Sequence, residues 1–109
     1  MKEFDMEKCK VDFKSLHWET PTIGARFKAY QKDKRRLRLV EFSKEFIEPD
    51  WCRKGHIGFV LDGEMEIDFD GEVVHFGPGD GLFIPAGETN KHMARVLTDV
   101  VKLILMEDV

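Results

Sequence analysis

The stretch GHIGFVLDGE at residues 55–64, followed by GPGDGLFIPAG at residues 77–87, decides the fold of this chain. In both stretches a short run of strand-forming residues ends at glycine or proline, which let the backbone turn sharply. Between them, residues 64–69 alternate acidic and apolar side chains with the period of a strand. Asp70-Gly71 predicts a tight hairpin, because both central positions of a type I′ turn favour positive φ. With a return strand at residues 73–76, the segment predicts short antiparallel strands.

The same pattern continues on both sides of this segment, whereas helical periodicity is scarce. Further strands are expected at residues 25–30, 37–47, 56–61, 92–97 and 100–106. Short strands at regular spacing, with turn residues between them, are typical of an all-β sandwich or barrel. The N-terminal segment carries less pattern, and we expect residues 1–22 to form either an N-terminal arm or an edge strand.

The composition indicates a single folded domain. At 109 residues with 42% hydrophobic residues, nine of them Phe, the chain has enough apolar side chains for one core. The net charge of −4 argues against a nucleic-acid binder, because such proteins normally carry a basic excess. The basic cluster at residues 32–36 is interrupted by an acid, so we interpret it as a solvated turn, with an anion-contacting patch as the alternative.

No segment of the sequence indicates export or a membrane. The charged first residues lack the apolar core of a signal peptide, and no apolar run approaches the ~20 residues of a membrane helix. Cys9 and Cys52 lie far apart and do not form the pattern of a secreted disulfide framework. We therefore expect a soluble, cytoplasmic protein with no membrane and no nucleic-acid partner.

Residues 55–64 resemble the end of the first motif of the cupin superfamily, in which a metal-binding acid precedes a turn of the type YVLEGE. Residues 77–87 resemble the second cupin motif, a PGD…IPAG run. The two motifs stand in the family's order and separation, and with the strands between them they span residues 37–97. The resemblance implies a small jelly-roll (cupin) β-barrel of the single-domain conserved-barrel type, with one domain over residues 1–109, and it implies a homodimer.

Carried onto this sequence, the metal motif of the family is degenerate. Its paired histidines fall at Asp50 and Cys52, or at Pro49 and Trp51 if a gap of one residue is allowed. Its glutamate falls at His56. The family's usual set of three histidines and one glutamate is therefore absent, and any metal site in this chain must use a different set of side chains.

A mixed set of metal ligands remains. The late histidine of the family falls at Asn90, and strand alternation would place His92 on the same face two residues further on. His56 and His92, joined by Cys52, Asp50 or Asn90, could hold one divalent transition metal: zinc, iron, manganese or nickel. The alternative is that these side chains are polar groups of a ligand pocket, hydrogen-bonded to each other or to water.

Three side chains near these positions have two interpretations each. Trp51 is expected at the barrel mouth, where it either packs in the core or forms one wall of a ligand site together with His56 and His92. Cys52 is either an inert buried side chain or a nucleophile activated by His56. Glu88 is either a solvated turn carboxylate or an acid–base group beside His92.

Two functions of different classes follow. The first is a cupin that binds a small polar ligand inside the barrel, with or without a metal ion, and performs no turnover. The second is a metal-dependent enzyme of the dioxygenase or isomerase kind, in which His56 and His92 hold the ion. The degenerate motif favours the binding protein, and whether the chain is an enzyme stays open. Alternation also places Ile57, Phe59 and Leu61 on the outer face, as an apolar surface for a second copy.

Overall fold

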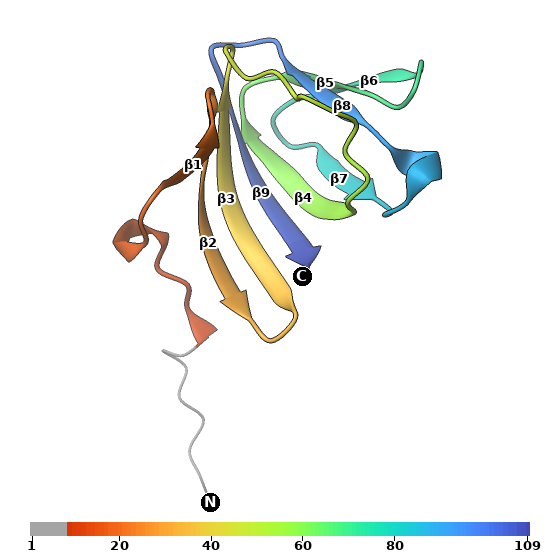
Figure 1. Cartoon of the computed structure of the whole chain (residues 1–109). Coiled ribbons are helices and arrows are strands. Elements are labelled where there is room, and N and C mark those ends of the chain that lie inside the picture. The colour runs from red at the N-terminus through yellow and green to blue at the C-terminus, as the bar shows by residue number, and fades with distance from the viewer. Residues whose placement is uncertain (1–8) are drawn as a thin grey trace, which may run out of the picture.

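A computed structural model describes residues 9–109 and contains two antiparallel sheets (Figure 1). The larger sheet has six strands in the order β1-β2-β3-β9-β4-β7, and the smaller has three in the order β6-β5-β8. The strands are β1 (Glu19–Thr22), β2 (Ala25–Lys32), β3 (Arg35–Ser43), β4 (His56–Asp62), β5 (Met65–Asp68), β6 (Val73–Phe76), β7 (Gly81–Ile84), β8 (Met93–Val96) and β9 (Val100–Asp108). Short 3₁₀ turns occur at η2 (Phe13–Ser15) and η3 (Glu88–Asn90). The predicted all-β class is confirmed.

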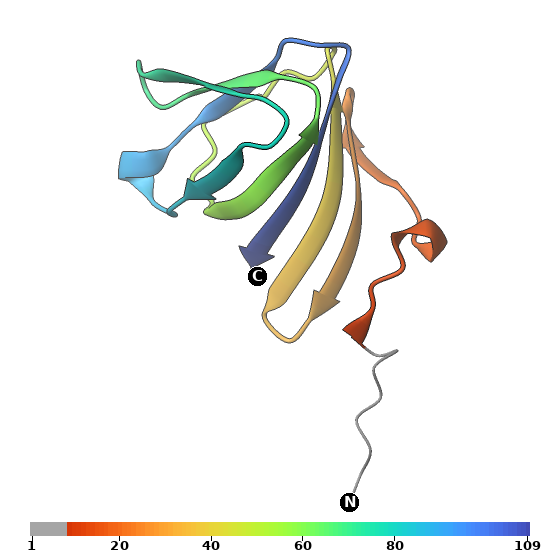
Figure 2. The same ribbon diagram turned by 180° about the vertical axis from the view of Figure 1, so that it is seen from behind.

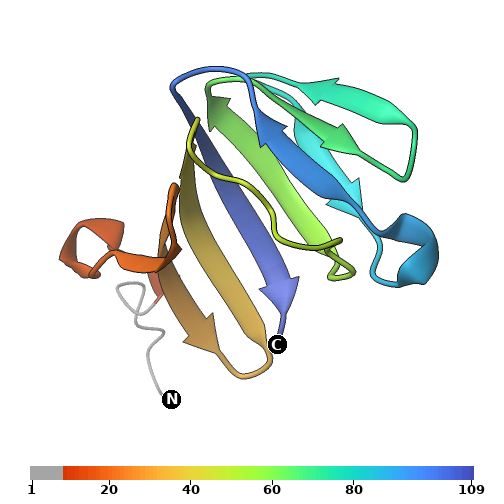
Figure 3. The same cartoon turned by 45° about the horizontal axis from the view of Figure 1, so that its top comes forward.

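The hydrophobic core lies between the two sheets. The smaller sheet lies on the β4–β7 side of the larger one, away from β1 and β2 (Figures 2 and 3). In β9 every second side chain is buried, from Val101 to Glu107, as expected for a strand with one face inside. The buried core consists of Val40, Val60, Leu82, Ile84, Val101, Leu103 and Leu105 from the larger sheet and Met65, Ile67 and Val96 from the smaller.

The hairpin between β5 and β6 has the predicted geometry. Asp70 and Gly71 both have positive φ, 58° and 108°. Phe69 N donates to Glu72 O at 2.8 Å, which closes a two-residue turn. The Asp68 carboxylate accepts from Gly71 N at 2.7 Å and stabilises it further.

The strand expected at residues 37–47 ends earlier than predicted. β3 stops at Ser43, because Phe46 N donates to Ser43 O at 3.0 Å and so turns the chain out of the sheet. The Phe46 ring stacks on Phe42 at 4.4 Å, which explains why apolar residues continue beyond the strand. The following loop, residues 44–55, runs across the space between the two sheets (Figure 3).

The N-terminal part of the described chain lies at one edge of the larger sheet. β1 pairs antiparallel with β2, so residues 19–22 form an edge strand. Residues 1–8 of the expected arm lie outside the described residues. Within residues 9–109, no helix has the length and apolar character needed to cross a membrane.

The turns around Gly63 and Gly79 differ in how crowded they are, and this difference predicts different costs of substitution. Gly63 has a φ of 79°, and a Cβ there would lie 2.1 Å from Val100 O. Gly79 has a φ of 92°, but a Cβ there would meet nothing within 4 Å. We expect Gly79→Ala to lower the free energy of unfolding by about 1–2 kcal/mol through backbone strain alone. Gly63→Ala should lower it by about 2–5 kcal/mol, because overpacking adds to the strain. Urea denaturation measures the free energy of unfolding of both variants. Equal losses would contradict the crowded turn described at Gly63.

Candidate functional site

A backbone bridge brings Cys52 and His92 together. Cys52 N donates to His92 O at 2.8 Å, and His92 N donates to Cys52 O at 2.9 Å. Residues paired in this way on antiparallel segments project their side chains to the same side. The bridge therefore fixes a thiol from the loop at residues 44–55 beside an imidazole from the segment that precedes β8. The His92 residue is only 3% exposed.

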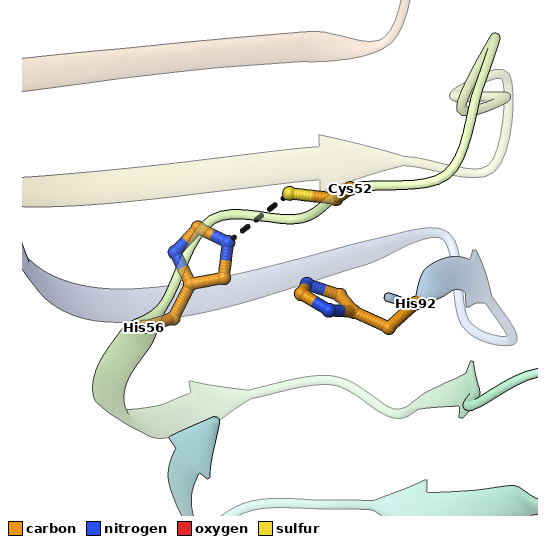
Figure 4. A group of neighbouring side chains, drawn as sticks. All are labelled: Cys52, His56 and His92. Carbon is orange, nitrogen blue, oxygen red and sulfur yellow. Dashed lines mark hydrogen bonds between the residues drawn. The ribbon is translucent and has the colours of Figure 1, made fainter. Parts of the chain in front are cut away.

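His56 completes the cluster from a third segment. It is the first residue of β4 and pairs with Ile84 of β7, so its side chain points to the inner face with that core residue. Cys52 Sγ and His56 Nε2 are 3.5 Å apart, and the His56 and His92 rings meet edge-on at 5.3 Å. Figure 4 shows the three side chains converging from three separate segments. One ligand atom of each residue lies within 4.8 Å of the other two.

Both imidazoles are oriented by acceptors on their outer side. His92 Nδ1 lies 3.0 Å from Asn90 O, and because a carbonyl can only accept, Nδ1 carries the proton. His56 Nδ1 lies 2.9 Å from Glu107 Oε2, at an angle too bent for a well-aligned hydrogen bond, so the contact is mainly electrostatic. In each ring Nε2 is left for the cluster. Outer partners of this kind accompany most metal-binding histidines.

Glu107 is the charged residue behind His56. It is 6% exposed and accepts two hydrogen bonds from Arg38, at 2.6 and 2.8 Å. Arg36 adds a single, longer bond through Nη2 at 3.2 Å. Burial alone would raise the pKa of Glu107, but His56 and Arg38 outweigh it and lower the pKa to about 2. The carboxylate is therefore charged at neutral pH and holds His56 from behind.

The thiol of Cys52 lies in a cationic environment. Its bond to His56, followed by its bond to His92, lowers the pKa of Cys52 to about 5. Burial opposes the charged form of His56, but Cys52 and Glu107 together raise the pKa of His56 to about 9. Both shifts favour a thiolate on Cys52 with the proton on His56, and a bound metal ion would displace that proton from Nε2. A thiolate is the form of cysteine that binds metals.

The cluster lines a cavity of about 210 Å³ between the sheets. The cavity walls also include Arg36, Arg38 and Lys54 and the carboxylates Glu48 and Glu107. Glu48 is fixed by Ala94 N, which donates to its Oε1 at 2.9 Å. Burial raises the pKa of Glu48, although the bond from Ala94 opposes this shift. A larger hollow of about 730 Å³ outside shares part of this lining, including His56.

The donor set fits a transition metal of the zinc or iron kind. Zinc bonds of about 2.3 Å to sulfur and about 2.0–2.1 Å to imidazole, arranged tetrahedrally, separate the two ligand atoms by about 3.6 Å. The 3.5 Å between Cys52 Sγ and His56 Nε2 agrees with this spacing. One thiolate and two imidazoles also match the ligand preferences of these ions.

Two other expected ligands, Asp50 and Asn90, do not join the cluster. The Asp50 carboxylate is exposed and accepts from Trp51 N at 2.7 Å. Asn90 lies in the 3₁₀ turn η3, so the strand alternation that placed it beside His92 does not apply, and its amide donates to Thr89 Oγ1 at 3.4 Å. Neither residue lines the cavity. Asn90 contributes instead through its backbone carbonyl, which orients His92.

The expected roles of Trp51 and Glu88 gain no support from their positions. Trp51 is half-buried next to the cluster but lines neither hollow, and the Lys91 ammonium lies 5.5 Å from the centre of its ring. Glu88 forms surface ion pairs with Arg53 at 2.9 Å and Lys91 at 3.3 Å. Glu88 therefore has no access to the cavity, and its expected acid–base role is without support.

Sequence reasoning missed Glu48 and Glu107. Glu107 continues the buried alternation of β9 one step beyond the predicted end at Met106, so a longer reading of that pattern would have found it. Glu48 lies in an irregular loop, where no periodic signal indicates which side chain points inward. Arg36 is also half-buried and lines the cavity, although the basic cluster at residues 32–36 was interpreted as a solvated turn.

Comparisons with known proteins agree with this architecture. A family model described as "Cupin domain" matches residues 47–106. KdgF from a Halomonas species has 22% identity and a TM-score of 0.69, with 86% of this chain and 89% of that chain covered. An RmlC-like cupin from Shewanella frigidimarina has 17% identity and a TM-score of 0.70, with 90% and 87% covered.

A third solved structure, a cupin superfamily protein from Desulfitobacterium hafniense, has 22% identity and a TM-score of 0.63, with 84% of this chain and 83% of that chain covered. No curated protein matches the chain. At these identities the likeness to solved structures shows the fold, and it confirms the predicted small jelly-roll barrel. The family motif with altered metal positions is confirmed with it.

Proposed function

The chain belongs to the cupin domain family, and on that premise we propose that it holds one divalent metal ion through Cys52, His56 and His92 and binds a small polar ligand in the adjoining cavity. One observation carries the proposal. The thiol and the two imidazole Nε2 atoms converge, while each Nδ1 atom is turned toward an acceptor outside the cluster. Chance proximity of polar side chains does not account for both features together.

The chemistry of the three metal-binding side chains narrows the choice of metal ion. Among the four ions expected, zinc and ferrous iron suit a thiolate with two imidazoles, whereas manganese prefers oxygen ligands. Three protein ligands leave a position of the ion free, as in zinc sites that act on small molecules. An ion bound there supplies a Lewis acid that attracts an oxygen atom of the bound ligand. The residues themselves hold and orient the ion.

A metal-dependent enzyme of the dioxygenase or isomerase kind is the second candidate. Glu48 favours it, because a carboxylate with a raised pKa in the same cavity as the metal ligands could accept or return a proton. Multiple turnovers on any substrate by the purified protein would establish this candidate over a binding protein. If replacing both His56 and His92 left such an activity intact, the metal-dependent enzyme would have to be withdrawn.

The metal proposal predicts which side chains determine metal content. Untagged protein incubated with zinc and then dialysed should contain about one zinc ion per chain by elemental analysis. Cys52→Ser and His92→Gln should each lower the content to background, because only two of the three ligands remain. His75→Gln is the matched control, since His75 is exposed and paired with Glu64 at 2.9 Å outside the cavity.

The same samples show how this prediction fails. Circular dichroism checks that each variant is folded. Folded Cys52→Ser and His92→Gln proteins that retain zinc, or wild-type protein that takes up neither zinc nor iron, would contradict the metal site.

We also propose that the outer face of the larger sheet pairs with a second copy. Ile57, Phe59 and Leu61 lie there at 43–46% exposure. The strand register places Phe83 and Met106 on either side of Ile57, and they are 78% and 38% exposed. Apolar surface of this kind on neighbouring strands is typical of an interface.

Charge placed on this face should disrupt the pairing. Sedimentation at micromolar concentration should give a dimer for the wild type and a monomer for Phe59→Lys. Ile47→Lys is the control, because Ile47 is 80% exposed but lies in the loop before β4 rather than on this face. A monomeric wild-type protein would exclude the proposed dimer.

A further inference from the structure

Two cationic side chains lie where the inner cavity meets the outer hollow. Arg36 of β3 and Lys54 of the loop before β4 line both spaces, as do His56 and Glu107. The lining that the two spaces share, which we call the passage, therefore carries a guanidinium and an ammonium. No ion pair of Lys54 occurs within residues 9–109.

Arg36 has binding capacity that the fold does not use. Glu107 already has both of its oxygens engaged by Arg38, at 2.6 and 2.8 Å, and Arg36 reaches it only through Nη2 at 3.2 Å. The Arg36 Nε atom is buried and has no hydrogen-bond partner among the described residues. A buried donor without a partner is costly. The Arg36 Nη1 atom also makes no hydrogen bond with the described residues, and unlike Nε it is not one of the buried atoms, so it is the donor that a ligand can reach.

The lining of the cavity carries an excess of positive charge. Three fixed cations, Arg36, Arg38 and Lys54, face two carboxylates, Glu48 and Glu107. The whole chain has a net charge of −4, so this local excess runs against the overall composition. An anionic ligand would neutralise it.

We infer that the ligand of this cavity is a small oxyanion, a carboxylate or a phosphate group, held by Arg36 and Lys54 beside the Cys52-His56-His92 cluster. The inference rests on the proposed function for the place of the ligand. The Arg36 guanidinium can donate to the oxyanion through Nη1, and the Lys54 ammonium adds a point charge from a second segment. Arg35, in the outer hollow, adds positive charge along the approach to the passage.

A purely structural role for Arg36 is the competing explanation. It would make Arg36 a second support of Glu107. It does not explain why the shorter bonds come from Arg38 alone, why Nη1 makes no hydrogen bond with the described residues, or why Lys54 lines the same passage. Lys54 makes no contact with Glu107 among the described ion pairs, so a Lys54 variant tests the anion site without disturbing that carboxylate.

The test uses defined probes on the full chain, because the natural ligand is unidentified. Isothermal titration measures the binding of succinate, of inorganic phosphate and of uncharged succinamide to zinc-loaded and to zinc-free protein. We expect succinate or phosphate, and not succinamide, to bind the wild type. Arg36→Gln and Lys54→Gln should each weaken that binding by about tenfold or more, since each removes a charge-assisted bond. Lys32→Gln removes the same charge from an exposed position that lines neither hollow and should bind as the wild type does.

Each outcome decides between an oxyanion site and a purely structural role for Arg36. Preference for succinate or for phosphate identifies which oxyanion the site takes. Failure of both anions to bind, equal binding of succinamide, or full binding by folded Lys54→Gln would overturn the inference. Zinc content is measured on the same samples and should be unchanged in Lys54→Gln. If the protein takes up no zinc but binds an anion in a Lys54-dependent way, the metal proposal fails and the anion site stands.

Discussion

The reciprocal pair of backbone hydrogen bonds between Cys52 and His92 is the constraint on which the site depends. It ties the loop at residues 44–55 to the segment that precedes β8, and the bond from Ala94 N to Glu48 holds the same loop at a second point. With it, a thiol from an irregular loop lies at a set place beside an imidazole. His56 needs no such device, because it begins β4 and the strand register directs its side chain inward. The cluster is therefore formed by the first residue of β4, the loop at residues 44–55 and the segment that precedes β8.

Charge placement gives this cluster its chemistry. Glu107 supports His56 from behind, and Arg38 compensates the buried carboxylate with two short bonds. Because one arginine is sufficient for that carboxylate, the second is left with unused donors at the passage into the cavity. In β9 the alternation that places Val101, Leu103 and Leu105 in the core ends on Glu107. The polar network around Glu107 is therefore directly next to the hydrophobic core.

The sequence predicted the fold in most of its parts because strand periodicity and turn chemistry are local signals. The Asp70-Gly71 hairpin and the strands of residues 56–61 and 100–106 needed only neighbouring residues to be recognised. His56 and His92 were found through motif positions, and Cys52 was one of three alternatives offered with them. The bridge that selects Cys52 over Asp50 and Asn90 joins residues 40 positions apart, and no local sequence pattern predicts it. Glu48, which lies in the same loop, was missed for the same reason.

X-ray absorption at the zinc edge tests the central claim most directly, because it reports the atoms bound to the ion. Zinc-loaded protein should show one sulfur at about 2.3 Å and two imidazole nitrogens at about 2.0–2.1 Å. Cys52→Ser should remove the sulfur, whereas Cys9→Ser should keep it, since Cys9 is exposed and distant in sequence from the cluster. A zinc ion surrounded by oxygen and nitrogen alone in the wild-type protein would contradict the assignment of Cys52, His56 and His92 as the metal-binding set.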